Sequence, residues 1–247
     1  MAIHIEEPSP EQSLAGHAGK PRKRKQIRGV IDDGFHPELV DGAIFDGVLK
    51  IPAVPAPKRI IVPTGLVPWS KVPYTKNPGD FGCFYEKDLA FREALLDIDA
   101  QRETLDSLPG WVTPDPSLYR DMSPVLQAAN VYMNRAVGYR MSRLGYYVVV
   151  NVRWGDESTY TNVLYPEPVA FLGAPKNSIV SIGTYGCSKT RRDKRYLREG
   201  LEAMLDYLAP QVVLVYGSMP SYVFDGLRSR AEFVRFPDWT TRVKGRG

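Results

Sequence analysis

The sequence predicts an α/β protein with a mostly parallel sheet of about six strands and crossover helices, forming an open sheet or an incomplete (β/α) barrel. Strand-like and helix-like segments alternate over roughly 155 residues, which is the pattern of a parallel sheet with right-handed crossovers. Residues 146–152 (YYVVVNV) are nearly all apolar or β-branched, as expected of a strand buried on both faces. Polar side chains cluster after each strand, so we expect them to share one edge of the sheet.

The regular domain is predicted to span residues 80–241. Residues 80–85 (DFGCFY) form its first strand, and an amphipathic helix runs from about 88 to 108, where Pro109-Gly110 ends it.

A second long helix is predicted after a short strand at 111–113. Ser123-Pro124 supplies an N-cap and a proline at the first helical position, and Gly145 ends the helix. Mid-helix Asn134 and Arg135 lie on a less apolar face, and either reach a strand-end carboxylate or are exposed. The elements that follow are strands at 146–152, 177–184, 211–216 and 232–236, with helices at 191–208 and 222–229.

Residues 29–79 are rich in proline, which removes backbone donors and restricts the preceding residue. This pattern predicts an irregular lead-in that wraps over the domain or forms a lid. Short extended pieces are expected at 48–51 and 59–62.

The net charge of +4 is concentrated at the two ends of the chain. Residues 1–28 carry +3 and residues 242–247 another +3, which leaves −2 on the body. We predict a flexible basic arm at 1–28 and a basic tail at 242–247. The arm either contacts nucleic-acid phosphates or serves only for solubility.

Histidines and cysteines exclude several kinds of site. His4, His17 and His36 all lie before the regular domain, so that domain has no histidine for a catalytic triad or a zinc site. Cys83 and Cys187 lack metal-ligand spacing and are expected to be free thiols in a reducing compartment. No apolar run is long enough to span a membrane, and the first residues do not form a secretory signal. We therefore expect no membrane partner and a cytoplasmic location, in the host if the protein is encoded by a phage.

Carboxylates follow three successive predicted strands at Asp88, Asp115 and Asp156. Together they could hold Mg²⁺ through oxygen ligands. Alternatively, one acts as a nucleophile and another as a general acid–base. A third alternative is that they are ordinary turn formers and helix caps.

The sequence GTYGCSKTRRDKR at 183–195 combines glycines with five bases at the start of a helix. Backbone amides near Gly186 and the charges of Lys189 and Arg191 predict a phosphate site, although the P-loop spacing is missing. The alternative is a solvated charged face. The other candidate binding residues at the strand ends are Ser117, Tyr119, Arg120, Arg153, Trp154, Tyr185 and Tyr216.

The run TPDPSLYRDMSPVLQAANVYMNRAVGYRMSRLGYYVVVNVRWGDESTY, with SIGTYGCSK and LVYGSMP downstream, resembles the domain-of-unknown-function 4417 family over about residues 81–241. That family usually has Ser-Pro-Asp-Phe-Ser in its first turn, where this chain has Thr113 and Pro116 in place of the first Ser and the Phe. The resemblance implies a bacterial, phage or mobile-element setting and adds no mechanism.

These features lead to three hypotheses. The first is a nucleic-acid- or nucleotide-directed enzyme, with DNA base exchange or glycosidic-bond chemistry as the best fit. Barrel-type transglycosylases provide a fold-level analogy for such a site without histidine. Asp115 would be the nucleophile or base, Asp156 its partner and Arg153 a substrate clamp. The second is a metal-dependent nuclease or phosphotransferase that uses Mg²⁺. The third is a nucleic-acid-binding accessory protein without catalysis.

Overall fold

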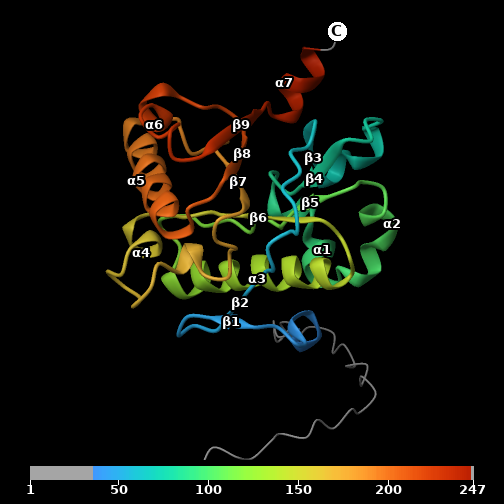
Figure 1. Cartoon of the computed structure of the whole chain (residues 1–247), viewed down its shortest axis with the longest axis horizontal. Coiled ribbons are helices and arrows are strands. Elements are labelled where there is room, and N and C mark those ends of the chain that lie inside the picture. Colours follow the sequence, from blue (N-terminus) through green and yellow to red (C-terminus); the bar gives the residue numbers. More distant parts are fainter. Residues whose placement is uncertain (1–35, 246–247) are drawn as a thin grey trace, which may run out of the picture. The chain divides into compact units, whose positions relative to one another are not determined.

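The computed structural model describes residues 36–245, and its centre is a seven-stranded, all-parallel sheet (Figure 1). The strands lie side by side in the order in which they occur in the chain. The first and last of them do not pair with each other, so the sheet curls into an open half-barrel. The predicted α/β fold with an incomplete barrel is therefore confirmed. The strands are β3 (Gly65–Pro68), β4 (Asp80–Cys83), β5 (Trp111–Val112), β6 (Val148–Asn151), β7 (Ile179–Gly183), β8 (Val212–Tyr216) and β9 (Glu232–Phe236).

The strand that the sequence did not predict, β3, comes from the proline-rich lead-in. It is an edge strand and ends at Pro68, in agreement with the tolerance of edge strands for proline. Of the two extended pieces expected in this region, 59–62 forms no strand and 48–51 overlaps a strand only at Ile51. The lead-in instead forms a small antiparallel pair, β1 (Phe45–Asp46) and β2 (Ile51–Pro52).

The continuous helix predicted at 88–108 is wrong. Four short segments occupy that stretch: η3 (Asp88–Ala90), α1 (Arg92–Leu96), η4 (Asp99–Gln101) and α2 (Arg102–Leu105). The break between α1 and η4 lies at Asp97, whose backbone leaves the helical region with φ −155° and ψ 85°. The Asp97 side chain accepts a hydrogen bond from the backbone of Ala100 at 3.0 Å and so begins a new turn.

The two long helices begin and end close to their predicted residues. Helix α3 (Pro124–Arg143) contacts both β6 and β2, and therefore lies between the sheet and the β1–β2 pair (Figure 1). Helix α5 (Arg191–Leu208) begins with a capping box. In that box Thr190 accepts a hydrogen bond from the backbone of Asp193, and the Asp193 carboxylate accepts one from the backbone of Thr190. The remaining helical segments are η1 (Pro37–Val40), η2 (Trp69–Tyr74), α4 (Glu157–Tyr160), η5 (Val169–Phe171), α6 (Ser221–Phe224) and α7 (Trp239–Lys244).

Arg135 and Asn134 of α3 are buried, at 1% and 4% exposure, and neither contacts a carboxylate. Arg135 donates to the backbone oxygens of Leu172, Ala170 and Asn151 and to the side-chain oxygen of Asn134. These carbonyl groups lie in or beside loops, where few strand partners can donate to them. Buried carbonyl groups need hydrogen-bond donors, and Arg135 provides them. The two expected outcomes for Arg135, pairing with a carboxylate or exposure, were therefore both wrong.

The face of the sheet away from α3 and α5 carries an apolar cluster of its own. Side chains of alternate residues, such as Phe81 and Cys83 of β4 with Tyr85 just beyond it, pack there with Leu214 and Tyr216 of β8. Tyr85 and Tyr216 are the last of these residues at the carboxyl end of the sheet.

The sequence assigned Arg242 to a basic tail, but the structure places it in α7 with a side chain that is 9% exposed. The predicted basic arm, residues 1–28, lies outside the described residues. Between residues 36 and 245 no helix is both long enough and apolar enough to cross a membrane.

Candidate functional site

A large cavity opens at the carboxyl ends of the strands and has a volume of about 1200 Å³. All seven strands contribute to its wall, either through their last residues or through the segments that follow them. The predicted site residues that line it are Asp115, Asp156, Arg153, Ser117, Tyr119, Arg120, Trp154, Tyr185, Gly186 and Tyr216. Lys189 and Arg191 do not line it.

Asp115 is the most deeply buried carboxylate of this cavity, at 4% exposure. Its Oδ1 accepts hydrogen bonds from Arg153 Nε at 2.9 Å and from Asn151 Nδ2 at 2.7 Å. Within residues 36–245, no group bonds to its Oδ2. Burial raises the pKa of Asp115 above its ordinary value, and the Arg153 charge and the Asn151 hydrogen bond offset part of that rise.

Asn151 connects Asp115 to a buried tyrosine. Its side-chain oxygen accepts from the hydroxyl of Tyr85 at 3.0 Å, and that hydroxyl also contacts Ser181 Oγ at 2.7 Å. Tyr85 stacks on Tyr216 with ring centroids 5.0 Å apart and an interplanar angle of 16°. The orientation of Asp115 is therefore fixed through strands β6 and β7.

Sequence reasoning missed Asn151 as a site residue. The signal was present, because Asn151 is the one amide in the otherwise apolar run YYVVVNV. A polar residue in such a strand needs a buried partner. Tyr85 carried no comparable signal, since an aromatic residue after a strand is usual in a core.

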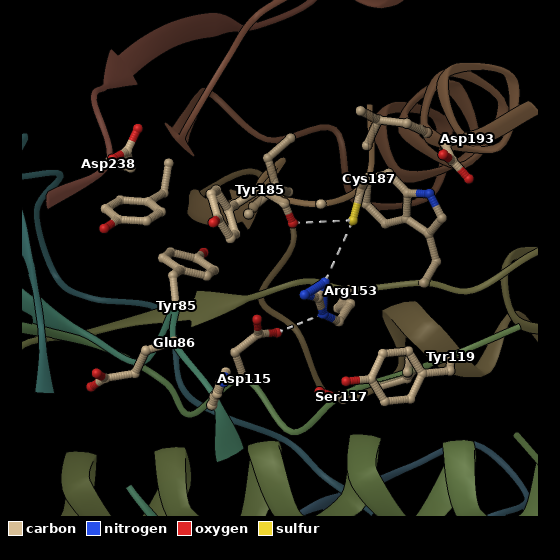
Figure 2. Close-up of a pocket in the computed structure, with 18 of the residues that line it drawn as sticks. Tyr85, Glu86, Asp115, Ser117, Tyr119, Arg153, Tyr185, Cys187, Asp193 and Asp238 are labelled. Atoms are coloured by element: carbon tan, nitrogen blue, oxygen red, sulfur yellow. Dashed lines mark hydrogen bonds and ion pairs between the residues drawn. The ribbon is translucent and has the colours of Figure 1, made fainter. Parts of the chain in front are cut away.

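Arg153 holds two groups of the site at once. Besides bonding to Asp115, it donates from Nη1 to Cys187 Sγ at 3.7 Å (Figure 2). Its guanidinium is therefore partly committed to the protein, which differs from the free substrate clamp that the sequence suggested. Burial raises the pKa of the Cys187 thiol; the Arg153 charge lowers it and the Asp115 charge raises it further.

The other two rim carboxylates form their hydrogen bonds with other parts of the fold, and neither bonds to Asp115. Asp156 is the N-cap of α4, where its Oδ1 accepts from the backbone and the hydroxyl of Ser158. Asp88 accepts from the backbone and the hydroxyl of Ser117. Asp156 still lines the cavity, whereas Asp88 does not.

The Mg²⁺ alternative needs carboxylates that converge on one point. In the described part of the chain, no three aspartate, glutamate, cysteine or histidine side chains come together in a way that fits a metal ion. The separate partners of Asp88, Asp115 and Asp156 explain why. Asp88, Asp115 and Asp156 therefore do not form one shared site for that ion.

The aromatic residues differ in how available they are to a ligand. Tyr119 and Tyr185 are 61% and 73% exposed and stand at the mouth of the cavity. Trp154 is partly buried, and its indole nitrogen donates to the backbone oxygen of Tyr196. Gly186, next to Tyr185, adopts φ +81° with open space where a side chain would project, so its glycine serves the turn itself.

The basic loop contributes a different base to the cavity from the two that were predicted. Arg192 lines the wall, and its guanidinium carbon is 5.7 Å from the centre of the Tyr196 ring. Arg120 approaches the same ring at 5.1 Å and pairs with Asp193 at 2.6 Å. Sequence reasoning selected Lys189 and Arg191 because they are closest to the glycines. In the structure, the helical turn of α5 directs Arg192 toward the cavity.

A second basic group was not predicted. Lys71, Lys87 and Lys244 line the cavity from segments after β3 and β4 and from α7. They lie far apart in the sequence and share no motif, so only the fold brings them to one wall.

Comparison with known proteins shows a family match and two similar phage proteins. Residues 43–237 match the family described as Domain of unknown function (DUF4417). The chain is similar to the "Gene 1 protein" of Mycobacterium phage L5, with 27% identity over 161 residues, which cover 64% of this chain and 67% of that protein. It is also similar to the "Gene 1 protein" of Mycobacterium phage D29, with 26% identity over 161 residues, 64% of this chain and 57% of that protein. The chain thus spans little more than half of the D29 protein. No solved structure matches it significantly.

Proposed function

This chain belongs to the family described as Domain of unknown function (DUF4417), and we propose that it is an enzyme acting on the nucleotide unit of a nucleotide or nucleic acid. The reaction that its cavity supports best is base exchange or cleavage at the glycosidic bond. One observation carries this proposal. Asp115 lines a large cavity with Oδ1 held by Arg153 and Asn151, while no described group occupies Oδ2.

A carboxylate held in this way suits nucleophilic attack at the sugar carbon. Asp115 Oδ2 would form a bond to C1′ as the C–N bond breaks, and the base would leave with the electron pair of that bond and take up a proton. Water or an incoming base would then attack C1′, lose one proton and release the Asp115 carboxylate. Asp115 could also act as a general base on the incoming group, for which a raised pKa is favourable.

Two neighbours would assist. Arg153 keeps Asp115 oriented and stabilises its charge through the bond at 2.9 Å. Asp156 lines the same cavity and is the candidate to donate a proton to the leaving base and to accept one from the incoming group. Since one oxygen of Asp156 already caps α4, this role falls to its other oxygen.

The walls of the cavity support a nucleotide as the ligand. Aromatic rings at Tyr119, Trp154 and Tyr185 provide faces on which a base can stack. Guanidinium and ammonium groups around them suit phosphate. The volume of about 1200 Å³ exceeds the roughly 300–1000 Å³ of common small-molecule pockets.

The experiment is a search for base release and base exchange. Purified full-length protein is incubated with single-stranded and duplex DNA and RNA, with and without added free bases, and the bases released or incorporated are identified by mass spectrometry. Asp115→Asn should abolish turnover, because an amide is a far weaker nucleophile. The matched control is Asp121→Asn, an exposed acid on the same cavity wall with no hydrogen bond to the described chain, which should retain turnover.

Circular dichroism and thermal unfolding show whether both variants fold. Equal turnover in the wild type and a folded Asp115→Asn variant would overturn the role of Asp115. Binding of nucleic acid with no change of any base under all conditions would favour the accessory-protein hypothesis instead.

A further inference from the structure

We infer that the cavity takes an internal nucleotide of a single polynucleotide strand, with one phosphate bound on each side of Asp115. This inference rests on the proposed function and adds the class of substrate to it. It is carried by two separate groups of bases that face the same cavity from opposite sides.

The first group consists of Arg120 and Arg192, beside the start of α5. Both guanidinium carbons lie within 6 Å of the centre of the Tyr196 ring, a distance at which cation–π attraction holds an arginine in place. The Arg192 side chain forms no ion pair or hydrogen bond with another described residue, so its donors are free for a ligand. An arginine that is positioned in advance presents a planar set of donors to phosphate with little loss of side-chain entropy.

The second group consists of Lys71, Lys87 and Lys244. These three ammonium groups line the cavity from the β3–β4 edge of the sheet and from α7, which packs against β3. Within residues 36–245 none of them forms an ion pair or a hydrogen bond through its side chain. Three unpaired cations at one wall repel one another, and a bound anion relieves that repulsion.

Asp115 lies between the two groups. Figure 2 shows Asp115 and Arg153 in the middle of the cavity. Glu86, the neighbour of Lys87, and Asp238, which caps α7, lie on one side of them, and Tyr119 and Asp193 on the other. The sheet order agrees, since the lysines surround β3 and β4 whereas Arg120 and Arg192 follow β5 and β7.

Most acids of the cavity already accept hydrogen bonds within the protein, whereas the side chains of Lys71, Lys87, Lys244 and Arg192 donate none to the described chain. Glu86 accepts from the backbone and the hydroxyl of Ser70. Asp238 accepts from Thr241 in the cap of α7. Asp193 is held by Thr190 and Arg120. Asp121 is exposed and bonds to no described group, and Asp156 keeps one oxygen outside its cap bonds. The bases available to a ligand therefore outnumber the available acids.

A ligand with a single phosphate would satisfy only one of the two groups. An internal nucleotide has a phosphodiester on its 5′ side and another on its 3′ side, with the sugar between them. With its phosphates at the two basic groups, the C1′ carbon of that sugar would lie over Asp115. A single strand also exposes the base for stacking on the aromatic wall without the cost of opening a duplex.

The inference is tested by the salt dependence of binding. Fluorescence anisotropy measures the affinity of the full-length protein for a labelled single-stranded oligonucleotide of about 12 nucleotides, as DNA and as RNA, over a range of salt concentrations. For single strands, the slope of log K against log salt changes by about 0.7 for each phosphate contact. We expect Arg192→Gln to reduce the slope by about 0.7 and the double substitution Lys87→Gln with Lys244→Gln to reduce it by at least as much.

Lys58→Gln and Arg228→Gln are the matched controls, since both residues are exposed and neither lines the cavity. Residues 1–28 are the same in every variant, so their contribution to the slope cancels. Competition by a trinucleotide should weaken when either basic group is substituted. Competition by a mononucleotide should weaken when only one of the two groups is substituted.

Each outcome bears on one claim. If the lysine variants bind the oligonucleotide and the trinucleotide as the controls do, the two-phosphate inference is overturned, while base release that depends on Asp115 can still stand. If neither nucleotides nor oligonucleotides compete at the cavity, the proposed function falls with it. The stronger of the DNA and RNA affinities identifies the natural strand.

Discussion

Arg242 Nη2 donates to Oδ2 of Asp80 at 2.6 Å, although the two residues are 162 positions apart in the chain. Asp80 is fully buried and also accepts from the hydroxyls of Thr64 and Thr75. This ion pair fastens α7 to the β3–β4 edge of the sheet. It therefore also holds the part of the cavity wall that α7 contributes.

Asp80→Asn should destabilise the protein by about 3–5 kcal/mol, because it leaves the buried Arg242 charge without a counter-ion. Urea unfolding measures the loss. The control is Asp206→Asn, since Asp206 is exposed and pairs with Arg230 at the surface. That change should cost about 1 kcal/mol or less. Similar losses for the two variants would contradict the structural role of the Asp80 pair.

Arg135→Met should cost about 3–5 kcal/mol. The substitution preserves apolar volume but leaves the backbone oxygens of Leu172, Ala170 and Asn151 buried without this donor. Arg143→Met, at an exposed position near the end of the same helix, should change stability by no more than about 0.5 kcal/mol. Thermal and urea unfolding both report the difference. A tolerated Arg135→Met would show that water can replace the guanidinium.

Gly200→Ala should destabilise the protein, opposite to the usual gain of about 1 kcal/mol for this change inside a helix. An added Cβ would lie 2.1 Å from Trp154 Nε1, so the indole must shift and its bond to the Tyr196 backbone is strained. We expect a loss of about 1–3 kcal/mol and a change in tryptophan emission. Lys194→Ala in the same helix is the control and should leave the emission unchanged. A stabilised Gly200→Ala variant would contradict the close packing.

The reactivity of Cys187 should depend on pH in a predictable direction. Since burial and the Asp115 charge raise its pKa, alkylation should accelerate only above the ordinary thiol pKa of about 8.5. Asp115→Asn removes a charge that opposes the thiolate and leaves Arg153 more available to it, so the midpoint of the rate–pH profile should move to lower pH. Iodoacetamide labelling followed by peptide mass spectrometry separates Cys187 from Cys83, whose side chain is fully buried. A midpoint that stays fixed or rises would show that Asp115 and Cys187 are not electrostatically linked.

The regular part of the fold was predictable from the sequence because its signals are local and strong. Residues 191–208 alternate apolar and polar groups with helical periodicity and match α5. The stretch after Lys87 was predicted wrongly because its leucine spacing suggested one continuous helix. In the structure the Asp97 side chain accepts a hydrogen bond from the Ala100 backbone, and the helix is divided there. Strand β3 was missed because its prolines lower strand propensity, which matters little at an edge.

The sequence predicted where the candidate site lies, at the carboxyl ends of the strands, but only some of the residues that form it. Asp115 and Arg153 stood out as polar residues after apolar strands, and the structure brings them together. The lysines of the second basic group had no such signal, because single lysines in loops are the most ordinary surface residues. The order of the strands brings these lysines to one cavity, and the spacing of residues in the sequence does not encode that order.

The order of the strands has a consequence for how the protein is made. Each strand pairs with the one synthesised just before it, so the sheet can grow at one edge as the chain leaves the ribosome. The cavity wall, however, includes residues from Pro68 to Lys244. The pocket is complete only when α7 has been synthesised and Arg242 has docked on Asp80. A nascent chain would thus acquire its scaffold gradually but its complete cavity in a single late step.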